Sequence, residues 1–520
     1  MIYLGNSSIG FASIGNIDNI VLPALVPPTS DKNYLYFQAE EQNSYISFVS
    51  PTSFAVSLQY STDGTNWSDW GKTVNGSYDV TDTITLDKRG DYVMIRAKTT
   101  NTWTGTIALF NEFRLSGGKV AAGGNIMSLF KSDVSSNNLT NYCFYKLFKD
   151  CKNLTTSPVL PATTLKTYCY AYMFENCTSL KTAPNLPGTT LGTYCYAFMF
   201  HNCTGMTTTM QNLPATTLQA NCYQNMFQGC ISITSGPSIS ATTIASYSCD
   251  SMFRDCVNLT TAPELPALTL NTYCYRYMFS GCEKLTTAPS LPATTLQKYC
   301  YQYMFDGCFS LTTPPTLAST SLSDYCYAYM FYRCTSLTTA PSLPATTLKT
   351  FCYQYMFGYC SSLTSAPTLS ATTMETGCYN GMFAYCTALT TAPTLPATTL
   401  AASCYNGMFN GCSSLVNVQA KLEATTLETS CYNAMYQNCT SLVTAPEIMA
   451  TTMATTCFGS MFRYCSSLDY VKIHITTWNT ANSKTWLGNV KATGTFAKPS
   501  GTTMTTSADA IPSGWTTENF

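Results

Sequence analysis

Apolar residues recur along most of the chain with a period of 26 or 27 residues. Each unit is centred on the motif Cys-Tyr-x-x-Met-Phe-x-x-Cys, and a degenerate first copy carries Leu147 in place of the methionine, so that thirteen units follow one another. The twelve methionines are Met173, Met199, Met226, Met252, Met278, Met304, Met330, Met356, Met382, Met408, Met435 and Met461. A fixed period of this length is the signature of a repeat architecture, so about 340 residues are expected to form one array.

Within a unit, apolar residues lie at positions −8, −5, −4, −3, 0, +1 and +4 relative to the methionine. This spacing predicts a short helix, over residues 296–308 in the unit of Met304. The next segment, residues 311–317, is short and contains prolines, so it predicts an extended edge or a turn. Neither element buries its apolar face alone. We therefore expect the units to stack as a solenoid, with a length on the order of 60 Å at a coil spacing of about 4.8 Å.

The N-terminal part has a different pattern, in which apolar and polar residues alternate as they do in strands. Predicted strands cover residues 34–37, 45–49, 55–60 and 92–96. Between two of these strands, the dipeptide Asp63-Gly64 is typical of a hairpin turn. We therefore predict a small β-sandwich over residues 26–115.

Glycines and tryptophans mark the other boundaries of the chain. A glycine-rich stretch predicts a linker over residues 116–138, and the solenoid is expected over residues 139–468. Residues 469–520 are predicted to form a C-terminal cap, in which a strand at 470–475 precedes a tail anchored by Trp478, Trp486 and Trp515.

The run Met-Phe-x-x-Cys-x-x-Leu-x-x-Ala-Pro-x-Leu-Pro resembles the BspA-like leucine-rich repeat over residues 139–468. It departs from that repeat in having Met before the Phe, a longer unit and a strand rich in Thr. These departures resemble a Thr-rich variant in proteins of gut Bacteroidetes and their bacteriophages, and the ending around Trp515 resembles the C-terminal cap of that variant. The resemblance implies an α+β leucine-rich-repeat solenoid that follows the predicted sandwich.

The opening of the chain, from Tyr3 to Gly10, resembles N-terminal segments of phage structural proteins. This resemblance implies that residues 1–25 anchor the chain in a virus particle. The candidate anchor residues are Tyr3, Leu4, Ile9, Ile17 and Ile20.

All 26 cysteines lie in the array, two per unit, and they stand eight residues apart in every unit but one. In that unit Cys249 lies seven residues before Cys256, a slip that disulfide geometry tolerates poorly. Eight residues of helix also separate two thiols by about 12 Å. We therefore predict two ladders of reduced, buried cysteines, although disulfides between adjacent coils remain an alternative. Zinc is disfavoured because no Cys-x-x-Cys occurs and His201 and His474 stand alone.

Positions −5 and −1 vary together among the units, and they lie four residues apart on one predicted helical face. They are mostly aromatic as far as Tyr355 and small afterwards, as in Gly377 and Gly381. The continuous aromatic block contains Tyr273, Tyr277, Tyr299, Tyr303, Tyr325, Tyr329, Phe351 and Tyr355. One interpretation is a surface on which the sugar rings of a host polysaccharide stack; the other, commoner for such stripes, is packing between helices.

Charge and composition exclude several functions. The net charge is −1 and only 10% of residues are charged, without a basic block, so neither nucleic acid nor an anionic membrane surface is an expected partner. No run of 18 apolar residues predicts a membrane span, and residues 1–20 lack the pattern of a secretory signal.

Catalytic motifs are also missing from the sequence. Neither Gly-x-Ser-x-Gly nor Gly-x-x-x-x-Gly-Lys occurs, and carboxylates such as Glu175, Asp306 and Glu423 have no fixed partner in the repeat pattern. We expect no enzymatic activity and no cofactor or metal.

Together these features favour a bacteriophage virion protein, a head or tail fibre that presents the solenoid to a host glycan or protein. Such a fibre would contact other virion proteins through its N-terminus, and a homotrimer is expected from its class. The alternatives are a BspA-like adhesin on a bacterial surface, which the missing secretion signal disfavours, and a capsid-decoration protein without a receptor.

Overall fold

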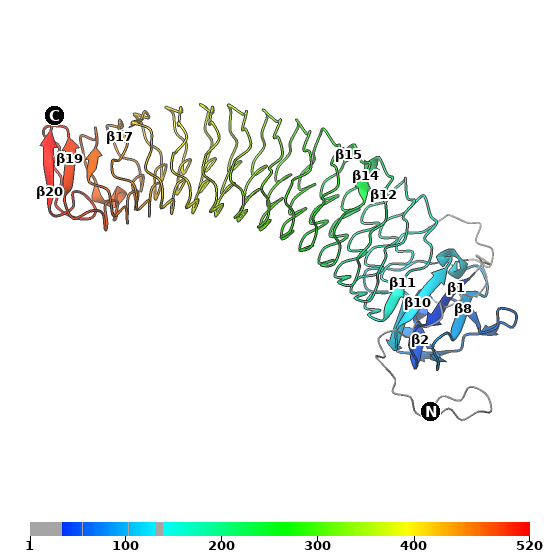
Figure 1. Cartoon of the computed structure of the whole chain (residues 1–520). Coiled ribbons are helices and arrows are strands. Elements are labelled where there is room, and N and C mark those ends of the chain that lie inside the picture. Colours follow the sequence, from blue (N-terminus) through cyan, green and yellow to red (C-terminus); the bar gives the residue numbers. More distant parts are fainter. Residues whose placement is uncertain (1–33, 55, 102, 131–138) are drawn as a thin grey trace, which may run out of the picture.

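The computed structural model describes residues 34–54, 56–101, 103–130 and 139–520. Two small sheets near the N-terminal end lead into a long row of coils, which lie side by side along a curved rod (Figure 1). Within the described ranges, no helix reaches the length and apolar character needed to cross a bilayer. The candidate anchor residues fall outside these ranges; they are Tyr3, Leu4, Ile9, Ile17 and Ile20.

The N-terminal part consists of two mostly antiparallel sheets. The first has the order β11-β10-β1-β8-β3-β4. Its strands are β1 (Leu35–Ala39), β3 (Leu58–Ser61), β4 (Ser68–Asp69), β8 (Tyr92–Ala97), β10 (Val120–Gly124) and β11 (Leu154–Thr156). The second has the order β5-β6-β2-β7, and β9 also pairs with β2. Its strands are β2 (Ser44–Pro51), β5 (Lys72–Asn75), β6 (Tyr78–Thr81), β7 (Ile84–Leu86) and β9 (Glu112–Gly117).

The predicted strands and hairpin of this part are present. Strands β3 and β4 pair through Tyr60 and Ser68 on either side of the Asp63-Gly64 turn, as expected. The two sheets share an aromatic core, in which the ring of Phe37 on β1 lies 5.1 Å from the ring of Phe113 on β9. These contacts make one buried unit of the two sheets, because the alternating residues of each strand point to one common side.

The glycine-rich stretch is part of the first sheet, which contradicts its prediction as a linker. Strand β10 pairs with β1 over its whole length and, in parallel, with β11 of the first coil. Its glycines serve close packing: a Cβ on Gly123 would lie 2.3 Å from the Tyr36 ring, and Gly124 has φ +76°. The first sheet therefore continues directly into the array.

The coils contain overlapping turns where helices were predicted. The predicted α+β class is therefore wrong in its helices, because the described residues contain no α-helix. In the described residues the only helices are three short 3₁₀ helices: η2 (Thr52–Phe54), η3 (Ile126–Leu129) and η4 (Thr480–Asn482). We call the turn segment, residues 297–308 in the unit of Met304 and their equivalents, the turn ribbon. Along it, every second N–H donates to the carbonyl three residues earlier, as Met304 does to Tyr301 (3.1 Å).

The remaining N–H groups of the turn ribbon donate to the next coil. Tyr303 donates to Ala328 (3.0 Å) and Phe305 to Met330 (2.9 Å). Strand-like bridges such as Thr287 with Thr313 hold the other sides of successive coils together. This pairing sets the coils about 4.8 Å apart, whereas packed helices need about 8–10 Å, so helices cannot occupy this side of the coil.

The remaining short strands of the array pair in parallel between successive coils. They are β12 (Asn212–Leu213), β13 (Thr217–Leu218), β14 (Ser238–Ile239), β15 (Thr243–Ile244), β16 (Lys421–Leu422) and β17 (Glu447–Ile448). Beyond them, β18 (Tyr470–Lys472), β19 (Gly494–Lys498) and β20 (Trp515–Asn519) form a parallel sheet at the C-terminal end. The predicted cap therefore continues the stacking of the coils. Its tryptophans form hydrogen bonds within the cap, as Trp486 does when its indole N–H donates to Ala510 O (2.8 Å).

The core of the array is a set of ladders in which like residues of successive coils touch. The rings of Phe279 and Phe305 lie 5.7 Å apart, and those of Tyr275 and Tyr301 lie 6.0 Å apart. Met304 is fully buried between such ladders. Because each residue packs against its own counterpart, the repeat pattern by itself builds a continuous core.

All 26 cysteines are free and buried. The second cysteine of most units donates its thiol hydrogen to a backbone carbonyl of the preceding coil, as Cys308 does to Phe279 O (3.1 Å). In the irregular unit, Ser248 occupies the usual cysteine position and donates to Ala245 O (2.8 Å), while Cys249 takes the place of the inner tyrosine. The ladders therefore work as small packed side chains that also satisfy carbonyl groups.

Candidate binding surface on the turn ribbon

The aromatic stripe lies at backbone positions with positive φ. Position −5 has φ near 60° in residues such as Tyr299, and position −1 has similar values in residues such as Tyr303. Position +3 shares this conformation, for example in Gly307. The left-handed conformation favours Gly and Asn, which explains why Gly, Asn and Ser replace Tyr at these positions in other units.

The eight candidate residues of the stripe form two columns of half-buried, stacked rings. The column at position −5 has centroid separations of 4.6 Å (Tyr273–Tyr299), 4.8 Å (Tyr299–Tyr325) and 5.1 Å (Tyr325–Phe351). The column at position −1 has separations of 4.8 Å (Tyr277–Tyr303), 4.4 Å (Tyr303–Tyr329) and 5.2 Å (Tyr329–Tyr355). The structure thus brings all eight residues together on one side of the coils.

Stacking covers the faces of these rings, and each of the side chains is partly exposed. A sugar ring cannot enter between rings only 4.4–5.2 Å apart, so the stripe offers hydroxyl groups rather than ring faces. Burial, followed by the neighbouring Tyr355, raises the pKa of Tyr329 to about 12. The hydroxyl groups therefore stay protonated and act as hydrogen-bond donors at neutral pH.

The C-terminal end of the stripe is set by packing. The ring of Tyr355 leans over Gly381, where a Cβ would lie 2.5 Å from ring atoms, and Phe351 covers Gly377 in the same way at 2.1 Å. At its other end, the guanidinium of Arg254 lies 5.0 Å from the ring centroid of Tyr277. Glycines therefore end both columns on the C-terminal side, while on the N-terminal side Arg254 covers Tyr277 and the other column continues from Tyr273 to Tyr247.

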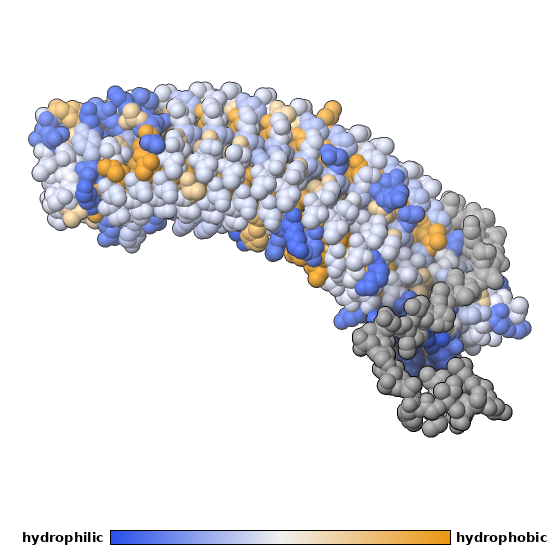
Figure 2. All heavy atoms as spheres, viewed as in Figure 1, coloured by the Kyte–Doolittle hydropathy of each residue, from blue (hydrophilic) through white to orange (hydrophobic). Residues whose placement is uncertain are grey.

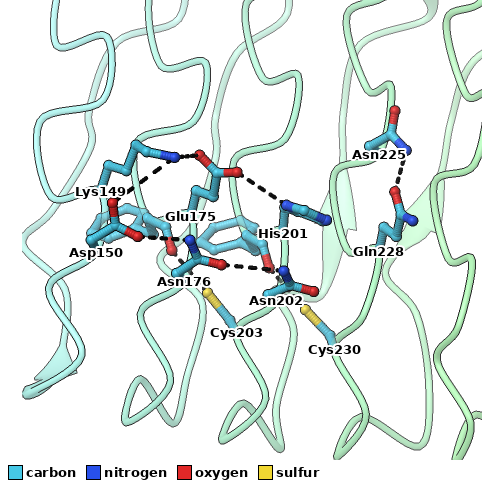
Figure 3. Close-up of polar contacts among 12 residues, drawn as sticks. Lys149, Asp150, Glu175, Asn176, His201, Asn202, Cys203, Asn225, Gln228 and Cys230 are labelled. Carbon is cyan, nitrogen blue, oxygen red and sulfur yellow. Dashed lines mark hydrogen bonds and ion pairs between the residues drawn. The ribbon is translucent and has the colours of Figure 1, made fainter.

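Polar ladders run beside the aromatic columns. In Figure 3, Glu175 lies between Lys149 and His201 of the two adjacent coils, with its Oε1 3.2 Å from His201 Nδ1. Burial acts to raise the pKa of Glu175, but the hydrogen bond from His201 and the ion pair with Lys149 outweigh it and lower the pKa. In a second row, Asn202 Nδ2 donates to the side chain of Asn176 (3.2 Å).

Two other carboxylates have bidentate arginine partners. Arg276 donates to both oxygens of Asp250 (3.1 and 3.0 Å), and Arg333 donates to both oxygens of Asp306 (3.0 Å each). The expectation that Glu175 and Asp306 have no fixed partner is therefore wrong. The partners stand 26 or 27 residues away, so comparing charged residues one unit apart could have found them.

The described residues hold no group of three or more His, Cys, Asp and Glu side chains that could bind a metal ion. His201 and His474 each bond to a glutamate, Glu175 and Glu447 respectively.

The left-handed backbone conformation of the stripe positions was not predicted from the sequence. The signal was present, because Gly and Asn recur at positions −5, −1 and +3, every four residues, and this is a turn signature.

A protein-family model matches the repeat region of the chain. A model of the BspA type leucine rich repeat region matches in six copies, over residues 137–286, 200–338, 249–390 and 376–491. No curated protein matches the chain. Among solved structures, the chain is similar to a leucine-rich repeat protein from Bacteroides ovatus, with 18% identity, 72% of this chain and 86% of that chain covered, and a TM-score of 0.41. It is also similar to a chain of the TLR13–ssRNA13 complex, with 12% identity, 66% and 46% covered, and a TM-score of 0.20.

Proposed function

The chain belongs to the BspA-type leucine-rich repeat family, and from this premise we propose that it is a non-enzymatic recognition protein that presents its solenoid to a cell surface. The observation that carries the proposal is the stripe of stacked rings, which holds a row of hydroxyl groups in fixed register along several coils. Such a row matches a ligand that itself repeats, as a polysaccharide does.

The surface of the array supports this role. Figure 2 shows that its visible face is dominated by residues of intermediate hydropathy, with few strongly hydrophilic or hydrophobic groups. Exposed Thr pairs, such as Thr286-Thr287 and Thr312-Thr313, supply much of this surface. Neutral hydroxyl groups suit recognition by hydrogen bonds, which neither attract nor repel a charged surface.

The setting we propose is a bacteriophage virion, as a head or tail fibre. Its N-terminal residues would contact other virion proteins, three copies would assemble, and a host glycan or protein would be the ligand. The proposal includes a count of thirteen units and a β-sandwich formed by the two N-terminal sheets. The Thr-rich form of the repeat and the opening of the sequence support this setting.

Immunogold labelling tests the setting. Antibody raised against residues 141–520 is applied to a lysate that contains both host cells and phage, and the particles are viewed by electron microscopy. Label on heads or tails is expected. Label confined to cell envelopes would refute the virion setting and leave a bacterial surface adhesin, and label on particles whose array binds no host cell would indicate a decoration protein.

A matched pair of substitutions tests the binding surface. Tyr303→Phe keeps the stacked ring and removes only the hydroxyl group, so we expect weaker binding to host cells and an unchanged melting temperature. Phe351→Tyr adds a hydroxyl group to the same stripe and serves as the converse variant. If Tyr303→Phe binds as the natural chain does, the hydroxyl row is not the binding surface.

A further inference from the structure

Near the C-terminal end of the array, the repeat pattern breaks on the side of the coil that normally carries Thr and Pro. The four preceding units have a small hydroxyl residue before the leucine of this side, namely Thr316, Ser342, Thr368 and Thr394. In the next three coils the corresponding residues are Lys421, Glu447 and Lys472. Lys421 pairs with Glu447 in parallel strands, and the bridge between Ile448 and Ile473 holds the coils of Glu447 and Lys472 together. Three charges thus replace three hydroxyl groups in a region otherwise poor in charge.

The same break opens a cavity of about 430 Å³. Its unit is one residue longer than its neighbours, and the segment Val416-Asn417-Val418-Gln419-Ala420 stands where other units have Thr-Thr-Ala-Pro. The walls combine the methyl groups of Val416 and Val418 with the polar groups of Asn417 and Thr444. Figure 2 shows hydrophobic and hydrophilic residues side by side at this end of the array, where Figure 1 labels β17.

Charged groups in and beside the cavity converge on one carboxylate: Glu447 and Lys472 line the cavity, and Lys421 and His474 contact Glu447 from outside the lining. Oε1 of Glu447 lies 2.8 Å from Lys472 Nζ and 2.8 Å from His474 Nε2, and its Oε2 lies 3.5 Å from Lys421 Nζ. Hydrogen bonds from His474 and Lys472 lower the pKa of Glu447 to about 2. Two lysines against one carboxylate leave a net charge of +1, and each lysine keeps a third to a half of its side chain exposed.

An exposed aromatic ring lies next to Lys472, outside the lining of the cavity. Phe520 is 50% exposed, and its ring lies 4.8 Å from Lys472 Nζ and 5.1 Å from the His474 ring. Unlike the tyrosines of the stripe, this ring has no described aromatic partner stacked in parallel on it. It can therefore receive the apolar face of a ligand beside the charged groups.

We propose that this cavity is a binding site for an anionic saccharide, one that carries a carboxylate or a sulfate group. The anionic group takes a charge-assisted hydrogen bond from Lys472, which lines the cavity, and one from Lys421 beside it, on the exposed sides of the two ammonium groups away from the Glu447 carboxylate. The hydroxyl groups of the sugar meet Asn417 and Thr444, and the C–H face of a sugar ring packs on Phe520. The volume is in the range of small-molecule sites, and the lining combines valine and alanine side chains with polar and charged groups.

This inference rests on the proposed recognition role for the origin of the saccharide, and on the cavity for its chemistry.

The inference is tested on the full chain with two polymers that differ in one group: polygalacturonate, whose sugars carry a carboxylate, and neutral galactan, whose sugars do not. Dextran sulfate and dextran form a second pair, which separates a preference for sulfate from one for carboxylate. Binding is measured by isothermal titration calorimetry at low salt and at 0.3 M NaCl.

We expect at least one anionic polymer to bind, more weakly at high salt, and both neutral polymers to bind at least tenfold more weakly. Lys472→Gln should weaken binding about tenfold, because one charge-assisted hydrogen bond is lost, while Lys472→Arg should retain it. Lys349→Gln, which removes an exposed lysine elsewhere on the array, is the matched control and should have no effect.

Three outcomes would overturn the inference: no binding of either anionic polymer, equal binding of the neutral ones, or equal effects of Lys472→Gln and Lys349→Gln. Phe520→Ala separates a saccharide site from a general anion site. A saccharide site loses affinity several-fold in this variant, whereas a site that holds the anionic group alone does not change. If the chain binds host cells but no anionic polymer, the recognition role stands and only this site fails.

Discussion

Two glycines in adjacent coils make it possible to measure the packing contact that ends the aromatic stripe separately from backbone strain. Gly381 and Gly407 occupy position −1 of successive units, and both have φ +60°. A Cβ at Gly381 would lie 2.5 Å from the Tyr355 ring, whereas a Cβ at Gly407 would have its nearest neighbour, Asn410 Cβ, at 4.0 Å. Replacing either glycine by alanine therefore causes the same backbone strain, and only the first replacement also causes a clash.

The magnitudes follow from these two terms. The left-handed conformation costs alanine about 1 kcal/mol, so Gly407→Ala should lower the free energy of unfolding by about that amount. Gly381→Ala adds overpacking against a ring held in a stack, which costs a further 1–3 kcal/mol or so. We expect a total of about 2–4 kcal/mol for Gly381→Ala.

Urea unfolding followed by circular dichroism measures both variants, with the midpoints compared at an unchanged slope. In a Tyr355→Ala background the clashing ring is gone, so adding Gly381→Ala there should cost only the backbone strain of about 1 kcal/mol. Equal destabilisation by Gly381→Ala and Gly407→Ala, or an undiminished cost of Gly381→Ala in the Tyr355→Ala background, would refute the packing explanation for the end of the stripe.

Three further predictions concern the core and the stripe. Met304→Asp should abolish the folded array, seen as a loss of resistance to proteolysis, because Met304 is fully buried and the new charge has no partner. Tyr303→Ala should lower the melting temperature because it breaks the stack with Tyr277 and Tyr329, and it should also weaken host binding if the stripe is the binding surface. Burial raises the pKa of thiols such as Cys326, to about 12, so the folded chain keeps protons that the unfolded chain releases above about pH 8.5. Stability should therefore be complete below that pH and fall steadily up to about pH 12 in thermal melts; a melting temperature unchanged between pH 8 and pH 10.5 would contradict this reasoning.

The repeat, the stacked array and the burial of its cysteines could be predicted from the sequence, because each depends only on which positions recur as apolar. The local backbone could not. The turn ribbon repeats every four residues, with one left-handed residue in each turn, whereas an α-helix repeats every 3.6 residues. The segment is only about three turns long, and over that length the two periods differ by only about one residue. Helical spacing and turn spacing therefore bury the same residues, such as Cys300, Met304 and Cys308.

The eight residues of the stripe lie side by side, as their shared repeat positions indicate, but their geometry differs from the one expected, and their role in binding stays a prediction. The tyrosines were assigned to a helical face, and the stacking that covers their own faces arises between coils, which no single unit reveals. The glycines of the expected linker show a similar limit. Gly123 and Gly124 permit close approach of strand β10 to Tyr36 and Tyr34, a requirement that composition alone does not distinguish from flexibility.

The hydrogen bonds between coils have a mechanical consequence. These bonds run along the rod from each coil to the next. When tension is applied at the two ends of the rod, all the bonds of one interface share the force, and every interface carries the same total force. The rod is therefore expected to break first at its weakest interface. The coil of Cys249 is the expected point of failure, because its cysteine interrupts the inner tyrosine ladder: among the described residues, Tyr223 stacks only on Tyr196, and Tyr275 only on Tyr301.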